Sequence, residues 1–424
     1  MNILVIGSGG REHTFCWKLS QSTHCKNLFA APGNAGTAKI ATNLDIAVTD
    51  FEKIKTAVLQ NQIDLVIVGP EAPLVAGIHD YFLQDERLKN IPVIGPQKAA
   101  ANLEGSKEFA KEFMSRHQIP TARYASFTKQ TIEAGCRFLE TMHPPYVLKA
   151  DGLAAGKGVL IIQDLKEAQS ALREMLVEKK FGAASAKVVV EEFLSGIELS
   201  CFVLTDGTSG LILPMAKDYK RIGEGDTGLN TGGMGAISPV PFADEIFTKK
   251  IHDRIVDPTL QGLKKDQLPY KGFIFIGLIN VNGDPYVIEY NVRMGDPETE
   301  AVLPRITNDW GVLMMATAQG TLHEHQIAID PRAATTIMAV SGGYPEAYEK
   351  GKIINGLAAV EDAVVFHAGT RLEGNQVVSD GGRVLAVTAL GDNMDLALKK
   401  AYQEIEKISF DKMYYRKDLG KDLL

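Results

Sequence analysis

Short apolar runs alternate with helix-like segments at the start of the chain. The runs at residues 3–6, Leu65–Val68 and 92–94 each lead into glycine or proline, and Phe51–Gln60 repeats apolar residues at the spacing of one helical face. Strands that are apolar throughout are typical of parallel sheets covered by helices on both faces. We therefore predict a parallel sheet, with its ligand beyond the carboxyl ends of the strands, at the glycine-rich turns.

A different pattern follows the predicted sheet. Residues 104–117 have helical spacing, with Phe109 and Phe113 one turn apart. Another helix is expected after Asp164, because Glu167 three residues later completes the pattern of a capping box. The remaining elements are expected as strands at 146–150, 159–162, 187–191, 199–204, 272–281, 285–291, 335–340 and 384–389 and a final helix near 395–408.

The expected fold class is α/β for the first part of the chain, where strands and helices alternate, and α+β for the parts that follow. A long glycine-rich stretch at 223–235 interrupts them, and unstructured loops of that length tend to be functional or mobile. We expect a parallel α/β domain at 1–103, a connecting helix at 104–120, a compact α+β unit at 121–189, a unit of longer strands at 190–325 and a C-terminal domain at 326–424.

Composition and charge narrow the class of function. The 424 residues carry a formal net charge of −7 without a long run of like charges, whereas nucleic-acid binders usually have a basic excess. No apolar run approaches the ~20 residues that span a bilayer, and the N-terminus lacks the basic region of a signal peptide. The four cysteines form no CxxC pair, so no zinc or redox motif is expected. We expect a cytoplasmic protein with no nucleic-acid partner and no membrane, although a small anionic substrate stays possible.

A glycine-rich turn, GSGGREH at residues 7–13, follows the first apolar run. Backbone N–H groups at such a turn can bind an anion. A dinucleotide site is disfavoured, because Glu12 stands where the third glycine of GxGxxG belongs and no acidic residue ends the second strand. We favour phosphate binding assisted by Arg11. The alternative is a tight turn without a ligand, and His13 alone is more often packed than catalytic.

Residues 146–159 predict a strand, a glycine-rich loop and a second strand. A loop of small residues can close over a triphosphate, and Lys149 on the first strand can neutralise phosphate oxygens. The segment is not a P-loop, because Lys157 is followed by Gly158 and then by a strand. A plain glycine-rich hairpin is the alternative.

Two further segments carry candidate chemistry. The stretch at 191–198 can offer backbone hydrogen bonds to an adenine edge, with Glu198 accepting from ribose hydroxyls, but an ordinary strand and loop fit it equally well. A later strand is expected to place Glu289, Asn291 and Arg293 on one face.

That polar face suits phosphate chemistry. A carboxylate and an amide oxygen suit a hard cation such as Mg²⁺ that bridges ATP phosphates, and Arg293 can stabilise charge on a transferring phosphoryl group. The alternation also puts Ile288 and Tyr290 together on the opposite face. A strand end with solvated polar residues is the alternative, but consecutive polar residues on one face of an otherwise apolar strand argue against it.

Together these motifs resemble the ATP-grasp ligases and, more closely, the phosphoribosylamine–glycine ligase (glycinamide ribonucleotide synthetase) family. The resemblance implies an N-terminal Rossmann-like domain, lid and central ATP-grasp domains, and a small β-rich C-terminal domain. The matching motifs run in order along the chain as GGREH at 9–13, PGNAG at 32–36, VGPEAPL at 68–74, LEGSK at 103–107, KADGLAAGKGV at 149–159, EEFLSG at 191–196, NTGGMGA at 230–236, GDPET at 295–299, SGGYP, HAGT and GGRVLAVTALG.

The resemblance also implies roles for the matching positions. The metal would be ligated by Glu289 and Asn291, and catalysis would involve Arg293 and Lys149. ATP would be bound by Lys107, Lys149, Gly156, Lys157, Gly158, Glu191, Glu192, Leu194 and Glu198. The other substrates would contact Gly9, Gly10, Arg11, Asn34, Glu71, Asn230, Gly232, Gly233 and Asp296.

Two positions depart from the family pattern. Met294 stands where phenylalanine is usual, which affects only packing. Gly277 stands where many ATP-grasp enzymes have a second acidic ligand on the preceding strand, so phosphate oxygens and water would complete the metal's shell.

The implied reaction joins glycine to 5-phosphoribosylamine at the cost of ATP, through glycyl phosphate, in purine biosynthesis. It implies Mg²⁺ or Mn²⁺, small-molecule substrates and a monomer or weak homodimer, with the loop at 151–158 excluding water. One alternative is another ATP-grasp carboxylate–amine ligase or carboxylase, which should lack PGNAG and GPEAPL. The others are a nicotinamide-dependent oxidoreductase built on the first domain and a non-catalytic nucleotide-binding regulator.

Overall fold

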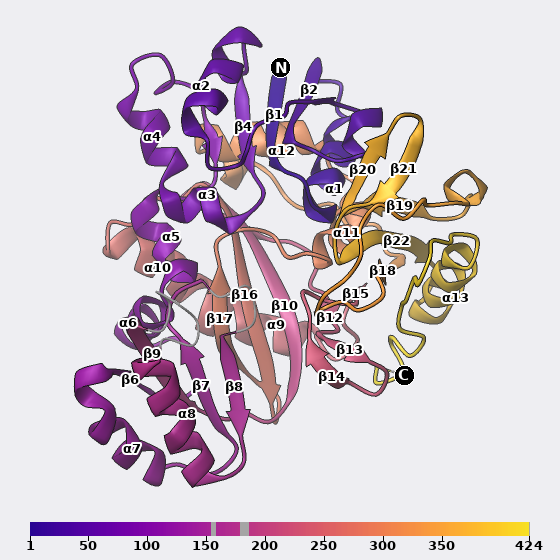
Figure 1. Ribbon diagram of the computed structural model, residues 1–424. Coiled ribbons are helices and arrows are strands. Elements are labelled where there is room, and N and C mark those ends of the chain that lie inside the picture. Colours follow the sequence, from indigo (N-terminus) through magenta and orange to yellow (C-terminus); the bar gives the residue numbers. More distant parts are fainter. Residues whose placement is uncertain (154–157, 179–185, 424) are drawn as a thin grey trace.

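The computed structural model describes residues 1–153, 158–178 and 186–423. Figure 1 shows the N-terminal elements at one end, a lid of strands and helices at the other, a central sheet between them and the C-terminal elements at one side. Gly156 and Lys157, two of the predicted ATP ligands, lie outside the described residues. Within the described part, no helix is both long and apolar enough to cross a membrane.

The chain begins with a five-stranded parallel sheet in the order β3-β2-β1-β4-β5, which confirms the prediction. The central strands β1 (Asn2–Gly7) and β4 (Leu65–Val68) are almost wholly buried, because their continuous apolar side chains meet packed helices and loops on both faces. The other elements of this region are β2 (Asn27–Pro32), β3 (Thr42–Asn43), β5 (Val93–Ile94), α1 (Gly10–Leu19), α2 (Phe51–Gln60), α3 (Glu71–Ala76) and α4 (Ile78–Gln84).

Two helices, rather than one, connect this sheet to the rest of the chain. The helix predicted at 104–117 is wrong at its start, because α5 (Lys98–Gly105) ends and α6 (Lys107–Arg116) begins on either side of Ser106. Ser106 has an extended backbone, and its hydroxyl accepts a hydrogen bond from Phe109 N at 3.1 Å. The serine therefore caps α6 and breaks the helical pattern.

The lid is a four-stranded antiparallel sheet, β6-β9-β7-β8, with two helices packed on it around a core of its own. Asp164 caps the second helix, since its carboxylate accepts from Glu167 N at 2.9 Å, as predicted. The lid elements are β6 (Tyr124–Thr128), β7 (Tyr146–Ala150), β8 (Val159–Ile162), β9 (Lys187–Glu192), α7 (Ile132–Glu140) and α8 (Leu165–Val177).

The central sheet is antiparallel, in the order β11-β10-β16-β17, and one face shares a hydrophobic core with the N-terminal region. Its elements are β10 (Ile197–Thr205), β11 (Gly210–Ile212), β16 (Gly272–Val281) and β17 (Asp284–Asn291), and the helices of its core face are α9 (Glu245–Ile251), a π-helical turn (His252–Val256) and α10 (Asp257–Lys265).

A bulge in β17 alters the predicted alternation of its side chains. Glu289 pairs with Gly277 on β16, but Leu278 pairs with Val287, so the register skips Ile288. The core accordingly contains Val287 and Tyr290, not Ile288 and Tyr290. The bulge lies before Glu289, so the polar face at the strand end keeps its predicted spacing.

The C-terminal region is a five-stranded sheet, β12-β15-β18-β22-β19, covered by α13. Two of its strands come from residues 217–238, and part of the predicted loop at 223–235 forms the hairpin β13-β14. The elements are β12 (Lys217–Asp218), β13 (Arg221–Gly223), β14 (Thr227–Asn230), β15 (Gly235–Ser238), β18 (Ala333–Val340), β19 (Val364–His367), β20 (Thr370–Glu373), β21 (Gln376–Ser379), β22 (Arg383–Gly391) and α13 (Met394–Ile405). Two helices precede β18: α11 (Glu298–Val302) packs against this sheet, and α12 (Trp310–Gln319) packs in the core of the N-terminal sheet.

Candidate active site

The polar end of β17 is near lysines from the lid, from α6 and from the segment between β12 and β13. The ammonium groups of Lys220, Lys149 and Lys107 lower the pKa of Glu289 below its ordinary value, although burial acts in the opposite direction. Glu289 is therefore held as an anion among cations. Its partner Gly277 has no side chain, and a Cβ there would lie only 3.3 Å from Glu289 Cγ.

Arg293 lies just beyond the strand and is held from several sides. One nitrogen, Nη2, donates to Glu104 Oε1 at 2.8 Å and to Asn291 Oδ1 at 3.1 Å. Nε lies 3.5 Å from Glu71 Oε2. The structure thus brings together the predicted catalytic arginine, one predicted metal ligand and Glu71, and it adds Glu104, which the sequence did not single out.

Lys149 on β7 shares a buried carboxylate with a second lysine. Glu191 Oε2 lies 3.0 Å from Lys149 Nζ and 3.0 Å from Lys111 Nζ, and all three side chains are buried. Burial lowers the pKa of Lys111 to about 8, with Glu191 opposing the shift. Lys111 was missed from the sequence, where the available signal was its position one turn after Lys107 on the same helix.

Lys107 binds the start of the glycine-rich segment rather than a free anion. Its Nζ donates to the carbonyls of Ala150 at 2.8 Å and Gly152 at 3.2 Å. Gly158, on the far side of that segment, accepts from Ala150 N at 2.8 Å. The Lys107 contacts place α6 beside the start of the loop that the sequence assigns to ATP.

The link between β9 and β10 lies at the edge of the lid. Glu192 accepts from Arg123 N at 2.7 Å, and Glu198 pairs with Lys220 at 2.6 Å. Among the described residues, no backbone hydrogen-bond partner is found for Leu194. Its N–H and carbonyl are therefore free to meet the edge of a base, whereas the two glutamates already have protein partners.

The turn at residues 7–13 binds carboxylates of the protein itself. Gly9 N donates to Glu12 Oε2 at 2.6 Å, and Arg11 N donates to Asp296 Oδ2 at 3.3 Å. The Arg11 guanidinium is buried against Glu12 Oε1 at 2.6 Å. A Cβ on Gly10 would lie 2.1 Å from Glu300 Oε1, so α1 begins in close contact with α11. The backbone N–H groups of Gly9 and Arg11, which were expected to bind a phosphate, thus already donate to carboxylates of the protein.

Glu12 also fills the crevice where a dinucleotide would bind. The strand order switches between β1 and β4, which is where open α/β sheets bind their ligands. A Cβ on Gly7 would lie 2.3 Å from Glu12 Cγ, and one on Gly69 would lie 2.0 Å from Glu12 Oε1. The carboxylate occupies the space of a pyrophosphate, which argues against the oxidoreductase alternative.

Asn34 and His13 connect the first domain to the C-terminal sheet. Asn34 Nδ2 donates to the carbonyls of Ser8 and His367, both at 2.8 Å. His13 Nδ1 accepts from His367 N at 2.7 Å, so this histidine is packed, as predicted. Both predicted site motifs thus contribute to the domain junction.

Arg383 joins the glycine-rich loop to the GDPE segment. Its Nη1 donates to the carbonyls of Gly232 and Asp296, both at 2.6 Å, and its Nη2 lies 2.9 Å from Asp296 Oδ1. Gly233 has a φ of +118°, and a Cβ there would lie 2.5 Å from Pro297 Cδ. Arg383 was missed because its motif, GGRVLAVTALG, reads as a strand. Asn230, in contrast, is exposed at the end of β14.

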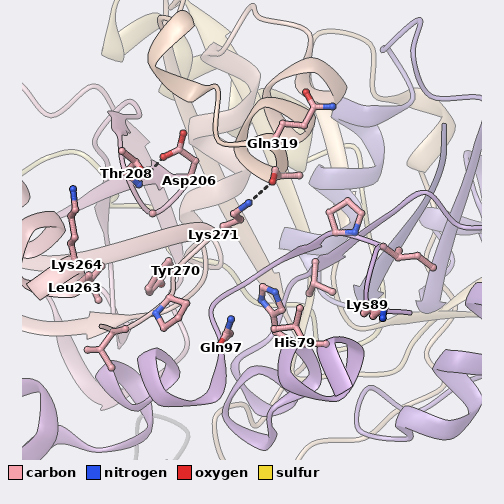
Figure 2. Close-up of a pocket in the computed structure, with 18 of the residues that line it drawn as sticks. His79, Lys89, Gln97, Asp206, Thr208, Leu263, Lys264, Tyr270, Lys271 and Gln319 are labelled. Carbon is pink, nitrogen blue, oxygen red and sulfur yellow. Dashed lines mark hydrogen bonds between the residues drawn. The ribbon is translucent and has the colours of Figure 1, made fainter. Parts of the chain in front are cut away.

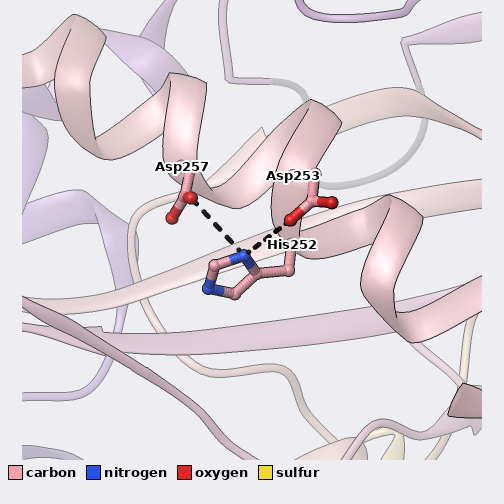
Figure 3. A group of neighbouring side chains, drawn as sticks. All are labelled: His252, Asp253 and Asp257. Carbon is pink, nitrogen blue, oxygen red and sulfur yellow. Dashed lines mark hydrogen bonds and ion pairs between the residues drawn. The ribbon is translucent and has the colours of Figure 1, made fainter.

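Another group of possible metal ligands lies on the opposite face of the central sheet. His252 Nδ1 is 3.3 Å from Asp253 Oδ1 and 3.4 Å from Asp257 Oδ2, because the π-helical turn aligns residues five apart (Figure 3). This helical segment covers the Tyr290 face of β17, not the Glu289 face. Lys249 already pairs with Asp253 at 2.7 Å, so we do not assign the metal here.

Family models cover nearly the whole chain. The Phosphoribosylglycinamide synthetase N domain matches residues 1–104, its ATP-grasp (A) domain matches 105–299 and its C domain matches 334–422. The Phosphoribosylamine--glycine ligase of Vibrio cholerae is 46% identical over 99% of this chain and 98% of its own length. The protein of the same name from Pseudomonas aeruginosa is 45% identical over 99% of this chain and 97% of its own length.

Solved structures agree with the sequence relatives. The Phosphoribosylamine--glycine ligase of Thermotoga maritima has a TM-score of 0.86 and 35% identity, with 99% of this chain and 100% of that chain covered. The biotin carboxylase domain of a Hydrogenobacter thermophilus 2-oxoglutarate carboxylase, solved with MgADP, has a TM-score of 0.74, 16% identity and coverage of 100% and 95%, which shows a shared ATP-grasp fold. Since the relatives match along the full length and all three domain models occur in order, the chain belongs to the phosphoribosylglycinamide synthetase family.

Proposed function

We propose that this protein joins glycine to 5-phosphoribosylamine, with ATP converted to ADP and phosphate. The observation that carries the proposal is the convergence of Lys149 and Lys107 on the anionic Glu289 beside Arg293. Relatives that share nearly half of its residues over their full length are named for this ligation. A nucleotide between the lid and the central sheet would place its phosphates among these groups.

The residues present fit a divalent cation and ATP. Glu289 is an anion at the end of β17, and the facing residue, Gly277, has no side chain that would compete for its carboxylate. Asn291 offers a second oxygen, now held by Arg293. We propose that these two residues hold Mg²⁺ or Mn²⁺, which prefer oxygen ligands and would neutralise phosphate oxygens when bound.

A buried oxygen of Glu191 supports a ligand beside the lid strands. Oε2 is held by Lys149 and Lys111, but Oε1 is buried with no partner among the described residues. A buried acceptor without a donor is costly. A ligand N–H or O–H would satisfy it, and the free backbone of Leu194 nearby in sequence suits a base edge.

The chain's own groups mainly position charge. A glycine carboxylate that attacks the γ-phosphoryl group of ATP displaces ADP and gives glycyl phosphate. The amine of phosphoribosylamine then attacks the acyl carbon, loses a proton and expels phosphate. Arg293, fixed by Glu104, would stabilise charge on the carboxylate and phosphoryl oxygens, and Lys149 would neutralise phosphate.

An ADP-release assay with each substrate omitted in turn tests the proposal. We expect ADP release to require both glycine and phosphoribosylamine, and we expect replacement of either one by another acid or amine to abolish it.

Lys149→Met should reduce turnover by roughly a hundredfold or more, because a positioned charge at the phosphoryl group is lost. Lys166→Met, an exposed lysine on the lid helix, is the control and should behave as wild type. ADP release with another amine, or a fully active Lys149→Met, would overturn the proposal.

A further inference from the structure

A second cavity lies away from the candidate active site. It measures about 770 Å³ and opens between N-terminal elements around α4 and β5 and the segment that joins α10 to β16 (Figure 2). None of the described site residues lines it. Its size is within the range of ~300–1,000 Å³ that is usual for small-molecule sites.

The lining carries uncompensated positive charge. The ammonium group of Lys264 has no hydrogen-bond or ion-pair partner among the described residues. Lys271 donates to the carbonyl of Ala318, a neutral acceptor, as the dashed line in Figure 2 shows. Lys89 is the third lysine, and it pairs with Glu86 at 2.5 Å. Two ammonium groups therefore face the cavity without a counter-ion.

The lining also contains one carboxylate, Asp206, for which no ion pair with either lysine is found among the described residues. Asp206 Oδ1 accepts from Thr208 N at 2.8 Å and Ser209 N at 2.7 Å. Its other oxygen, Oδ2, accepts from Leu322 N at 3.0 Å. These bonds fix Asp206 to its own turn and to the start of a helical segment. With three lysines and one carboxylate the lining keeps a positive charge and attracts an anion, although the whole chain carries a net charge of −7.

His79 adds a hydrogen-bond acceptor on the opposite wall. Its Nδ1 lies 2.6 Å from the carbonyl oxygen of Gly95, which can only accept, so Nδ1 carries the hydrogen and Nε2 keeps a lone pair. Burial lowers the pKa of His79, which keeps the ring neutral. In Figure 2, His79 of α4 and Gln97, just before α5, lie on the side of the cavity away from Lys264.

Apolar side chains complete the walls. Ile91, Leu263, Leu268 and Met315 line the cavity beside Tyr270. Rings pack well on such surfaces, while charged groups do not.

Backbone hydrogen bonds hold the two walls together. Gly95 N donates to the carbonyl of Lys271 at 2.7 Å. Gln97 N donates to that of Pro269 at 3.4 Å. The cavity is therefore preformed, as small-molecule sites usually are.

We propose that this cavity binds a small aromatic anion. Its acid group meets Lys264 and Lys271, its ring packs against the apolar wall, and an N–H or O–H on the ligand donates to His79 Nε2. The site is separate from the cleft at Glu289, so its occupant binds alongside the nucleotide.

Titration with 8-anilinonaphthalene-1-sulfonate, an aromatic anion with an N–H donor, tests the site. Saturating Mg²⁺ and ADP are included, so that the dye does not report the nucleotide cleft. We expect one dye per chain, with roughly tenfold weaker binding in Lys264→Glu, because an attractive charge becomes repulsive. Lys265→Glu is the matched control, since it changes the same charge at the next position of α10 but does not line the cavity. Equal affinity in the two variants would overturn the proposal.

Filling the cavity provides a second, charge-independent test. Ala318→Phe places a ring among the lining residues and should abolish dye binding. A melting curve and ADP release show whether this variant is folded. If it is not folded, the comparison of Lys264→Glu with Lys265→Glu tests the site on its own. A folded Ala318→Phe that binds the dye like wild type contradicts the site.

Discussion

Glu104 holds the Arg293 side chain with one carboxylate oxygen and the preceding backbone with the other. Oε1 accepts from Arg293 Nη2 at 2.8 Å, while Oε2 accepts from the backbone N–H of Val292 at 2.7 Å. The carboxylate is only 7% exposed, so both bonds are shielded from water. Because Glu104 sits at the end of α5, it fixes the side chain and the backbone of the β17 end relative to the N-terminal region.

Glu104→Gln should therefore lower kcat more than it changes KM for ATP. An amide cannot accept from both partners, and losing a charge-assisted hydrogen bond of ~1.5–3 kcal/mol corresponds to roughly a ten- to hundredfold slower reaction. Steady-state kinetics of the variant measure kcat and KM for ATP separately. Glu112→Gln, an exposed glutamate on the adjacent helix α6, is the control. A rise in KM for ATP with kcat unchanged would contradict the positioning role.

Local patterns predicted much of the fold. Phe51–Gln60, Tyr146–Ala150 and Gly272–Val281 occur with the predicted bounds, because strong periodicity or continuous apolar character coincides with clear end signals. The break between α5 and α6 was not predicted, since both flanks favour a helix and only the Ser106 cap separates them.

The site was predictable only where its residues share a local motif. Glu289, Asn291 and Arg293 lie on one strand end, so spacing alone groups them. Lys111 reaches Glu191 across 80 positions and Arg383 reaches Gly232 across 151, and no local pattern encodes such pairs. Folding, not periodicity, brings these partners together.

Lys111→Met should weaken ATP binding. Glu191 Oε2 is now shared by Lys111 and Lys149, each at 3.0 Å. Without Lys111, the carboxylate binds Lys149 alone and more tightly, which leaves less positive charge for phosphate. We expect KM for ATP to rise by roughly tenfold and the free energy of unfolding to fall by ~1–3 kcal/mol, because a buried ion pair loses one partner.

Steady-state kinetics and urea unfolding check both parts of this expectation. Lys265→Met, at an exposed end of α10, controls for the loss of one charge. An unchanged KM in Lys111→Met would show that Lys149 is not limited by the shared carboxylate.

Stability should fall in mild acid because of His13 and His367. Burial lowers the pKa of His13 to about 4 and that of His367 to about 3, from an ordinary 6.5. Below pH 6.5 the unfolded chain binds protons that the folded chain cannot, so the free energy of unfolding decreases as the pH falls. For His13 alone the loss approaches ~3 kcal/mol by pH 4.

Urea unfolding at several pH values between 6.5 and 4 measures this slope. His13→Asn keeps an acceptor near the position of Nδ1, which meets His367 N at 2.7 Å, but does not titrate. The variant should therefore lose less stability than wild type over that range. Parallel pH profiles for the two proteins would assign the acid sensitivity to other groups.

Arg383→Lys should impair ligation while leaving nucleotide binding intact. The Arg383 guanidinium contacts the carbonyls of Gly232 and Asp296 at 2.6 Å and the Asp296 carboxylate at 2.9 Å, and a lysine keeps the charge but not this planar fork. Gly232 belongs to the loop expected near the reacting carboxylate, so kcat/KM for glycine should fall by roughly a hundredfold, since small misplacements of reacting groups are costly. ATP affinity should stay within about twofold, because Lys149 and Glu191 belong to the lid and do not contact Arg383.

The control is Arg371→Lys on the exposed hairpin β20-β21. It changes the same residue type away from the loop at Gly232 and should leave both glycine and ATP kinetics unchanged. If Arg383→Lys instead weakens ATP and glycine equally, the C-terminal sheet supports the whole cleft rather than the loop at Gly232.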